Sequence, residues 1–150
     1  FIAGATFDKA IAKAMKTDPA SADAAKKNRV LLVSDEDKEA AIEAFDREGM
    51  AVSKAASGVL KDLYTEVSRS IDFYLSQGVD HSISKIILSG GMSNLGNITK
   101  FLAAEFKVPV EVANPLSFLP EPPKNMPKDV APALAVAAGL ALRKLKDWEE

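Results

Sequence analysis

The sequence contains no cysteine and only one histidine, His81. Without cysteine the chain forms no disulfide and no thiolate metal site, a composition that suits a reducing compartment. A single histidine leaves little material for a Ser-His-Asp relay or a histidine-rich metal centre. We interpret His81, which follows Asp80, as a solvated loop residue. The sequence therefore predicts no catalytic residue and no metal site of its own.

The chain also lacks an excess of charge of one sign and a long apolar run. Its 19 Lys and Arg against 21 Asp and Glu give a net charge of −2, which offers no long-range field to nucleic acid or to an anionic membrane. The longest uncharged apolar run, residues 130–142, is well short of the ~20 residues that a membrane-spanning helix requires. We therefore expect no nucleic-acid partner and no direct membrane insertion.

The beginning of the chain has no methionine, no basic segment and no apolar segment of a signal peptide. We therefore expect residue 1 to be an internal position of a longer protein. The 150 residues are 47% hydrophobic, which is enough for one hydrophobic core and excludes a disordered or collagen-like chain.

Hydrophobic spacing and turn residues predict an alternation of helices and strands. The predicted helices cover residues 7–15 with Thr6 as the N-cap, 18–28, 34–47, 53–77, 95–106 and 130–146. The predicted strands cover the end of one at 1–3, then 83–88 and 108–113. Gly49 is expected to end a helix, and the proline-rich stretch 119–129 is expected to be a loop. Because a helix separates the last two strands, parallel pairing is the default.

The most specific local signal is the stretch Lys85–Leu95, in which a short apolar strand ends in the pair Gly90-Gly91 before a helical pattern begins. Glycine adopts positive φ and lets a ligand approach the main chain, and the start of a helix presents unpaired N–H groups. The pattern indicates a nucleotide-binding turn, but a glycine pair can also serve the turn alone. Replacing Gly91 with valine would distinguish these, since we expect positive φ there: a mere turn loses stability, whereas a site also loses nucleotide affinity.

Four sequence blocks occur in an order typical of one known superfamily. They are Arg69–Leu75, Ile87–Gly91 with Asn94-Leu95, Val110–Pro115 and Ala131–Arg143. Together they resemble the second half of the actin-like ATPase (ribonuclease H-like) fold, which actin, the Hsp70 ATPase domain, sugar kinases and bacterial FtsA share. Within this superfamily the sequence is most similar to the PilM family of type IV pilus assembly proteins.

The resemblance implies an α/β fold with a mostly parallel sheet, helices on both of its faces and a small helical inserted subdomain. Residues 1–56 are similar to that inserted subdomain, known as IIB. Residues 57–150 are similar to the larger subdomain IIA, with a long connecting helix, the Gly-Gly adenosine turn and a C-terminal helix.

The resemblance also implies seven residues that contact a nucleotide. The group expected around the adenosine and the α-phosphate is Gly90, Gly91, Met92 and Ser93. The group expected on the opposite side, at the ribose and adenine, is Asp23, Lys26 and Lys27. Backbone amides and lysine suit phosphate, and a carboxylate suits sugar hydroxyls. Asp23 and Lys26 are equally explained as one solvated helix face.

Relatives hold the β- and γ-phosphates and Mg²⁺ on two hairpin loops that have no counterpart in these residues. The resemblance therefore implies ATP with Mg²⁺ in the longer protein, weak or no binding by this chain alone, and no enzyme activity here. It implies a cytoplasmic nucleotide-binding scaffold of type IV pilus biogenesis. This scaffold would lie at the inner face of the bacterial inner membrane through its partners, a PilN-like N-terminal tail and the pilus motor ATPases.

Three alternatives remain open at this point. An FtsA-like division protein would carry a C-terminal amphipathic membrane helix, whereas Lys146–Glu150 is short and acidic. A sugar or small-molecule kinase would need a catalytic carboxylate and a substrate pocket. A bare interaction module would use the glycine pair only for the turn.

Overall fold

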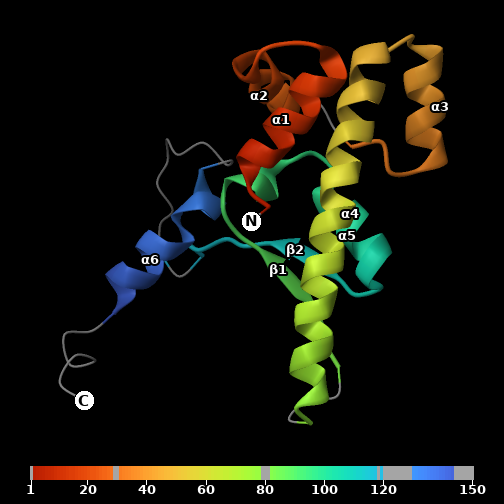
Figure 1. Ribbon diagram of the computed structural model, residues 1–150. Helices are drawn as coiled ribbons and strands as arrows, with labels where there is room; N and C mark the ends of the chain where they lie inside the picture. Colours follow the sequence, from red (N-terminus) through yellow and green to blue (C-terminus); the bar gives the residue numbers. More distant parts are fainter. Residues whose placement is uncertain (1, 29–30, 79–81, 118, 120–129, 144–150) are drawn as a thin grey trace.

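The computed structural model describes residues 2–28, 31–78, 82–117, 119 and 130–143 (Figure 1). Its helices are α1 (Gly4–Met15), α2 (Pro19–Asn28), α3 (Asp35–Glu43), α4 (Arg47–Ser76), α5 (Ile98–Phe106) and α6 (Ala135–Leu142). Its strands and short 3₁₀ helices are β1 (Ile86–Leu88), β2 (Val110–Val112), η1 (Gly91–Asn94) and η2 (Ala131–Leu134). The predictions for residues 1, 81, 120–129 and 144–146 lie outside the described residues.

Helix α1 begins earlier than the sequence pattern predicts. Ala3 is the N-cap, and Thr6, the third residue of the helix, accepts a hydrogen bond from the Ala3 N–H at its Oγ1 (3.3 Å). The prediction of Thr6 as the N-cap is therefore wrong, as is the strand predicted at residues 2 and 3. Thr6 accepts from the N–H of the cap residue, whereas a cap side chain accepts from an N–H inside the first turn. Both positions favour a short polar side chain, which makes them hard to distinguish in sequence.

Helix α4 is a single helix of 30 residues that starts six residues before the predicted start at residue 53. Its N-cap Asp46 accepts a hydrogen bond from the Gly49 N–H (2.9 Å), and a Cβ at Gly49 would collide with that carboxylate. Gly49 therefore makes room for the cap of α4 and does not end α3. The break between the helices lies instead at Phe45, which adopts a φ of +51°.

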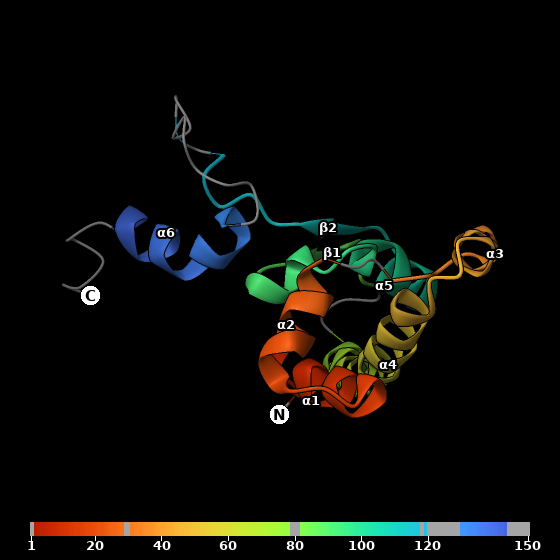
Figure 2. The same cartoon turned by 90° about the horizontal axis from the view of Figure 1, so that it is seen from above.

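Strands β1 and β2 pair in parallel, as predicted, with Ile86 opposite Val110 and Leu88 opposite Val112. Leu88 and Val110 pack against the core on one face of the sheet, whereas Ile87 on the other face is 58% exposed. Within the described part of the chain, the helices that join this core therefore cover one face, and the prediction of helices on both faces is not met. Helix α6 lies apart from the group formed by α1, α2 and α4 in both views (Figures 1 and 2).

The core connects the helices to the sheet. One cluster of buried side chains comes from α1, α4, α5 and the segments beside them: Phe7, Leu31, Ala56, Val59, Leu60, Leu95, Ile98, Phe101 and Leu102. A second cluster joins α1 and α2 to α4: Ile11, Ala22, Ala25 and Val52. Helix α4 crosses the predicted subdomain boundary at residue 56 without a break, so that division stays a prediction. Of the helices that the structure describes, none has both the length and the apolar character needed to cross a bilayer.

Candidate functional site

The glycine turn after β1 is held by hydrogen bonds on both sides. The Gly90 N–H donates to the Pro132 carbonyl (2.8 Å), and the Ser93 hydroxyl donates back to the Gly90 carbonyl (2.7 Å). Gly90 has a φ of +88°, which only glycine adopts readily. Gly91 lies outside the positive-φ region, and a Cβ there would meet no atom within 4 Å. The prediction of positive φ at Gly91 is therefore wrong: the turn needs the glycine at position 90, and position 91 faces open space.

A charged cluster lies at the C-terminal half of α2. The Lys26 ammonium is 2.6 Å from Asp8 Oδ1 on α1 and 3.0 Å from Asp23 Oδ1, and the Lys27 ammonium is 2.6 Å from Asp23 Oδ2. The Lys26 side chain is 9% exposed, so its ammonium depends on these two carboxylates for compensation. Two lysines and two aspartates balance, so this cluster has no net charge.

The pKa values in the cluster shift in the direction that keeps the pairs charged. Burial acts to lower the pKa of Lys26, but the hydrogen bonds to Asp8 and Asp23 outweigh it and raise that pKa above its ordinary value. Hydrogen bonds from Lys27 and then Lys26 lower the pKa of Asp23. Lys26 and Asp23 are therefore ionised at neutral pH, and a ligand of this site would meet fixed ion pairs.

The glycine turn and the end of α2 meet across a pocket of about 710 Å³. It is lined by Gly4, Lys26, Lys27, Asn28, Gly91, Met92, Asn94 and Leu95. A Cβ at Gly4 would lie 3.6 Å from Met92 Sδ and 4.0 Å from Lys26 Nζ, which shows how closely the start of α1 approaches both walls. Such a volume is typical of small-molecule sites, which span roughly 300–1,000 Å³.

The structure thus brings four of the seven predicted site residues into one pocket: Lys26, Lys27, Gly91 and Met92. The other three do not line the pocket. Asp23 forms ion pairs with the two lysines that do, and Gly90 and Ser93 form the hydrogen-bonded turn that contains Gly91 and Met92. Four further residues that line the pocket were not predicted as site residues: Gly4, Asn28, Asn94 and Leu95. The last three directly follow predicted residues along the chain, so extending each motif by one or two positions would have found them. Gly4 has no comparable signal.

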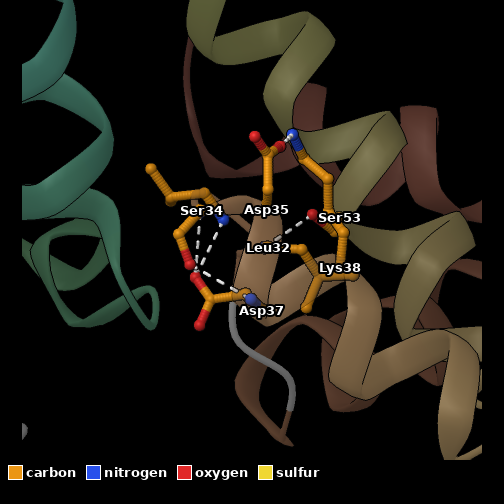
Figure 3. Close-up of polar contacts among 7 residues, drawn as sticks. Leu32, Ser34, Asp35, Asp37, Lys38 and Ser53 are labelled. Carbon is orange, nitrogen blue, oxygen red and sulfur yellow. Dashed lines mark hydrogen bonds and ion pairs between the residues drawn. The ribbon is translucent and has the colours of Figure 1, made fainter.

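Two further hollows lie along α4 and contain none of the predicted residues. One, of about 390 Å³, is lined by Glu66, Val67, Ser70, Ile71, Tyr74 and Ile83. The other, of about 370 Å³, lies between α3 and α4 and is lined by residues that include Lys38, Ile42 and Ser53. Two of its polar residues are engaged within the protein: Ser53 Oγ accepts from the Leu32 N–H (2.8 Å), and Lys38 pairs with Asp35 (2.7 Å) (Figure 3). The surface that lines this hollow is mainly apolar.

The polar contacts in Figure 3 also show how the chain enters α3. Ser34 Oγ accepts from the Asp37 N–H (3.1 Å), and the Asp37 carboxylate accepts from the Ser34 N–H (3.0 Å). This reciprocal pair is a capping box, and its bond to the backbone N–H lowers the pKa of Asp37. The residues just before it are tied to both helices, because the Leu32 N–H donates to Ser53 Oγ on α4 and the Val33 N–H donates to Asp37 Oδ2 on α3 (3.2 Å).

Comparison with known proteins adds two findings. The family model described as type IV pilus assembly protein PilM matches residues 57–145, more than half of the chain. A chain of a solved PilM-PilN type IV pilus biogenesis complex is similar in structure, with a TM-score of 0.68 and 27% sequence identity. The similarity covers 95% of the present chain but 37% of that chain, so the present chain spans little more than a third of its solved relative.

Proposed function

This chain belongs to the family of type IV pilus assembly proteins PilM, and from this we propose that it serves type IV pilus biogenesis as part of a nucleotide-binding scaffold, in which it supplies half of the ATP site. The observation that carries the nucleotide part is the pocket of about 710 Å³ between the glycine turn and the end of α2. The family match favours a pilus protein over the division protein or the kinase, so we do not propose those alternatives.

The chemistry of the pocket suits the nucleoside end of a nucleotide. Met92 and Leu95 offer apolar surface for a base, while Lys27 and Asn28 offer polar groups for the ribose and α-phosphate. Because the ion pairs of Lys26 and Lys27 with aspartates balance in charge, this wall has no surplus cation for a polyphosphate. The β- and γ-phosphates with Mg²⁺ would therefore be held by parts of the natural-length protein outside these residues, and this chain alone is proposed to have no enzyme activity.

The fold supports the same proposal. The parallel pair β1 and β2, joined by α5, and the similarity over 95% of the chain are consistent with the second half of an actin-like fold. The name of the solved relative includes PilN, which makes a PilN-like N-terminal tail the proposed partner, with the pilus motor ATPases as further proposed partners. Through them the protein would lie at the cytoplasmic face of the inner membrane.

Calorimetric titration of ATP with Mg²⁺ into the natural-length protein and into residues 1–150 tests the proposal. We expect measurable affinity for the natural-length protein and much weaker or no heat for the 150-residue chain, because the pocket in these residues suits only the nucleoside end of the nucleotide. Equal affinity in both would contradict the proposal that these residues supply only half of the ATP site. No binding to either would contradict nucleotide binding altogether. Fluorescence anisotropy with a labelled PilN-type N-terminal peptide tests the partner in the same preparation.

A further inference from the structure

The backbone of Leu31 is tied to the turn before α5 by two hydrogen bonds. Its N–H donates to the Gly96 carbonyl (3.0 Å), and its carbonyl accepts from Asn97 Nδ2 (2.9 Å). Leu31 is 1% exposed, and its side chain belongs to the main core cluster. The bond from Asn97 spans 66 positions of the sequence, so it connects two parts of the fold that the local chain does not hold together.

These bonds join two segments that follow the two walls of the pocket along the chain. Leu31 follows Asn28, the last pocket residue of α2, by three positions, and Gly96 and Asn97 follow Leu95, the last pocket residue of the glycine turn. We infer that Asn97 is a positioning residue that holds the two walls of the pocket at a fixed separation. The inference rests on the proposed nucleotide function for its consequence, but its structural part is measurable without any nucleotide.

The conformation of Asn97 supports this role. It is the N-cap of α5, where an asparagine oxygen usually accepts a hydrogen bond from its own helix, yet here the side chain makes no cap bond and donates to Leu31 instead. Its φ of +62° is a left-handed conformation that glycine adopts at less cost. Glycine would therefore suit the backbone equally well, and what asparagine adds is the bond across the fold.

The test compares Asn97→Gly with Lys107→Gly in the natural-length protein. Lys107 ends the same helix, has a φ of +59° and is exposed, so its replacement relieves the same strain without touching the pocket. Spin labels on Ala24→Cys and Ala104→Cys, both exposed, report the separation of α2 and α5 by double electron-electron resonance. The 150 residues contain no cysteine, so the labels attach only at the two introduced positions. Any cysteine in the rest of the natural-length protein is replaced by serine.

We expect Asn97→Gly to broaden the distance distribution and to weaken the affinity for ATP with Mg²⁺ about fivefold, the effect of one net hydrogen bond. Lys107→Gly should change neither. Asn97→Asp, which keeps the size and the left-handed preference but places a carboxylate against the Leu31 carbonyl, should broaden the distribution in the same way. It also serves as the second variant if the glycine variant folds poorly.

An unchanged distance distribution in both Asn97 variants would overturn the inference. A broadened distribution with unchanged nucleotide affinity would overturn the role in the pocket. If the distance distribution broadens and even the unsubstituted protein binds no nucleotide, the positioning role of Asn97 is supported and the proposed nucleotide function fails. The two failures are therefore distinguishable.

Discussion

Adding a side chain at Gly90 should mainly lower the stability of the fold, whereas adding one at Gly91 should mainly weaken nucleotide binding. Gly91 lines the pocket, lies outside the positive-φ region and would carry a Cβ with no other atom within 4 Å. Gly90 has a φ of +88° and does not line the pocket. Under the proposed nucleotide function the two glycines therefore have separate roles: Gly90 permits the backbone turn, and Gly91 leaves room for the ligand.

The magnitudes follow from this separation. Gly91→Val should leave the free energy of unfolding within about 0.5 kcal/mol, because a Cβ there meets no atom within 4 Å and Gly91 lies outside the positive-φ region. In the proposed nucleotide complex the valine side chain would occupy space that the ligand fills. An overpacking cost of about 1–3 kcal/mol corresponds to a roughly 5- to 150-fold rise in Kd. Gly90→Val should lower the free energy of unfolding by about 1–3 kcal/mol, because a φ of +88° with a ψ of 170° is a conformation that essentially only glycine adopts.

Urea unfolding gives the stability of each variant, and calorimetry with ATP and Mg²⁺ on the natural-length protein gives the affinity. Gly139→Val is the control, since a Cβ there also meets nothing within 4 Å but lies on α6 outside the pocket. The reasoning is refuted if Gly91→Val is as destabilising as Gly90→Val, or if it binds nucleotide as tightly as the unsubstituted protein does.

Three further predictions concern charge and backbone strain. Lys26→Met removes the ion-pair partner of Asp8 and leaves Asp23 paired with Lys27 alone, so it should lower the free energy of unfolding by about 1–3 kcal/mol. Lys38→Met, in an exposed ion pair, should change it by less than about 0.5 kcal/mol. Equal losses in urea unfolding would contradict the role of the buried pair. Hydrogen bonds from Ser21 lower the pKa of Asp18 from 3.8 to about 2, so Asp18 stabilises the fold above about pH 4 and loses this effect as the pH falls toward 2. The stability difference between the unsubstituted protein and Asp18→Asn, followed by urea unfolding from pH 5 to pH 2, should shrink, and a constant difference would contradict the shift. Phe45→Gly should raise the free energy of unfolding by about 1 kcal/mol, because Phe45 is 83% exposed and held at a φ of +51°; a loss of stability in thermal unfolding would show that its ring makes contacts that outweigh the strain.

The elements with strong periodicity were predictable from the sequence. The apolar stripe of α4 and the order strand, helix and strand from β1 to β2 are present as predicted, since burying a continuous face leaves a regular pattern. The strands are three residues each, shorter than the predicted ranges 83–88 and 108–113. The ends of α1 and α4 were not predictable, because Thr6 and Gly49 act through capping contacts that a spacing pattern does not encode.

The residues of the candidate site also fall into those that the sequence predicts and those that it does not. The glycine turn was visible because its residues are adjacent in sequence, and so were Lys26 and Lys27 through the family resemblance. The partner of Lys26, Asp8, lies 18 positions earlier on another helix, and Gly4 approaches the pocket only through the packing of α1. Tertiary packing creates these contacts, and a single sequence carries no local signal for them.

Photolabelling of the natural-length protein with 8-azido-ATP, followed by mapping of the labelled peptides, tests directly whether a nucleotide binds between α2 and the glycine turn. The pocket predicts label on the turn around Met92 and Leu95, or on the end of α2 at Lys27 and Asn28, with the label lost in Gly91→Val and in excess ATP. Specific, ATP-protected label confined to other segments of the protein would contradict a nucleotide site between α2 and the glycine turn.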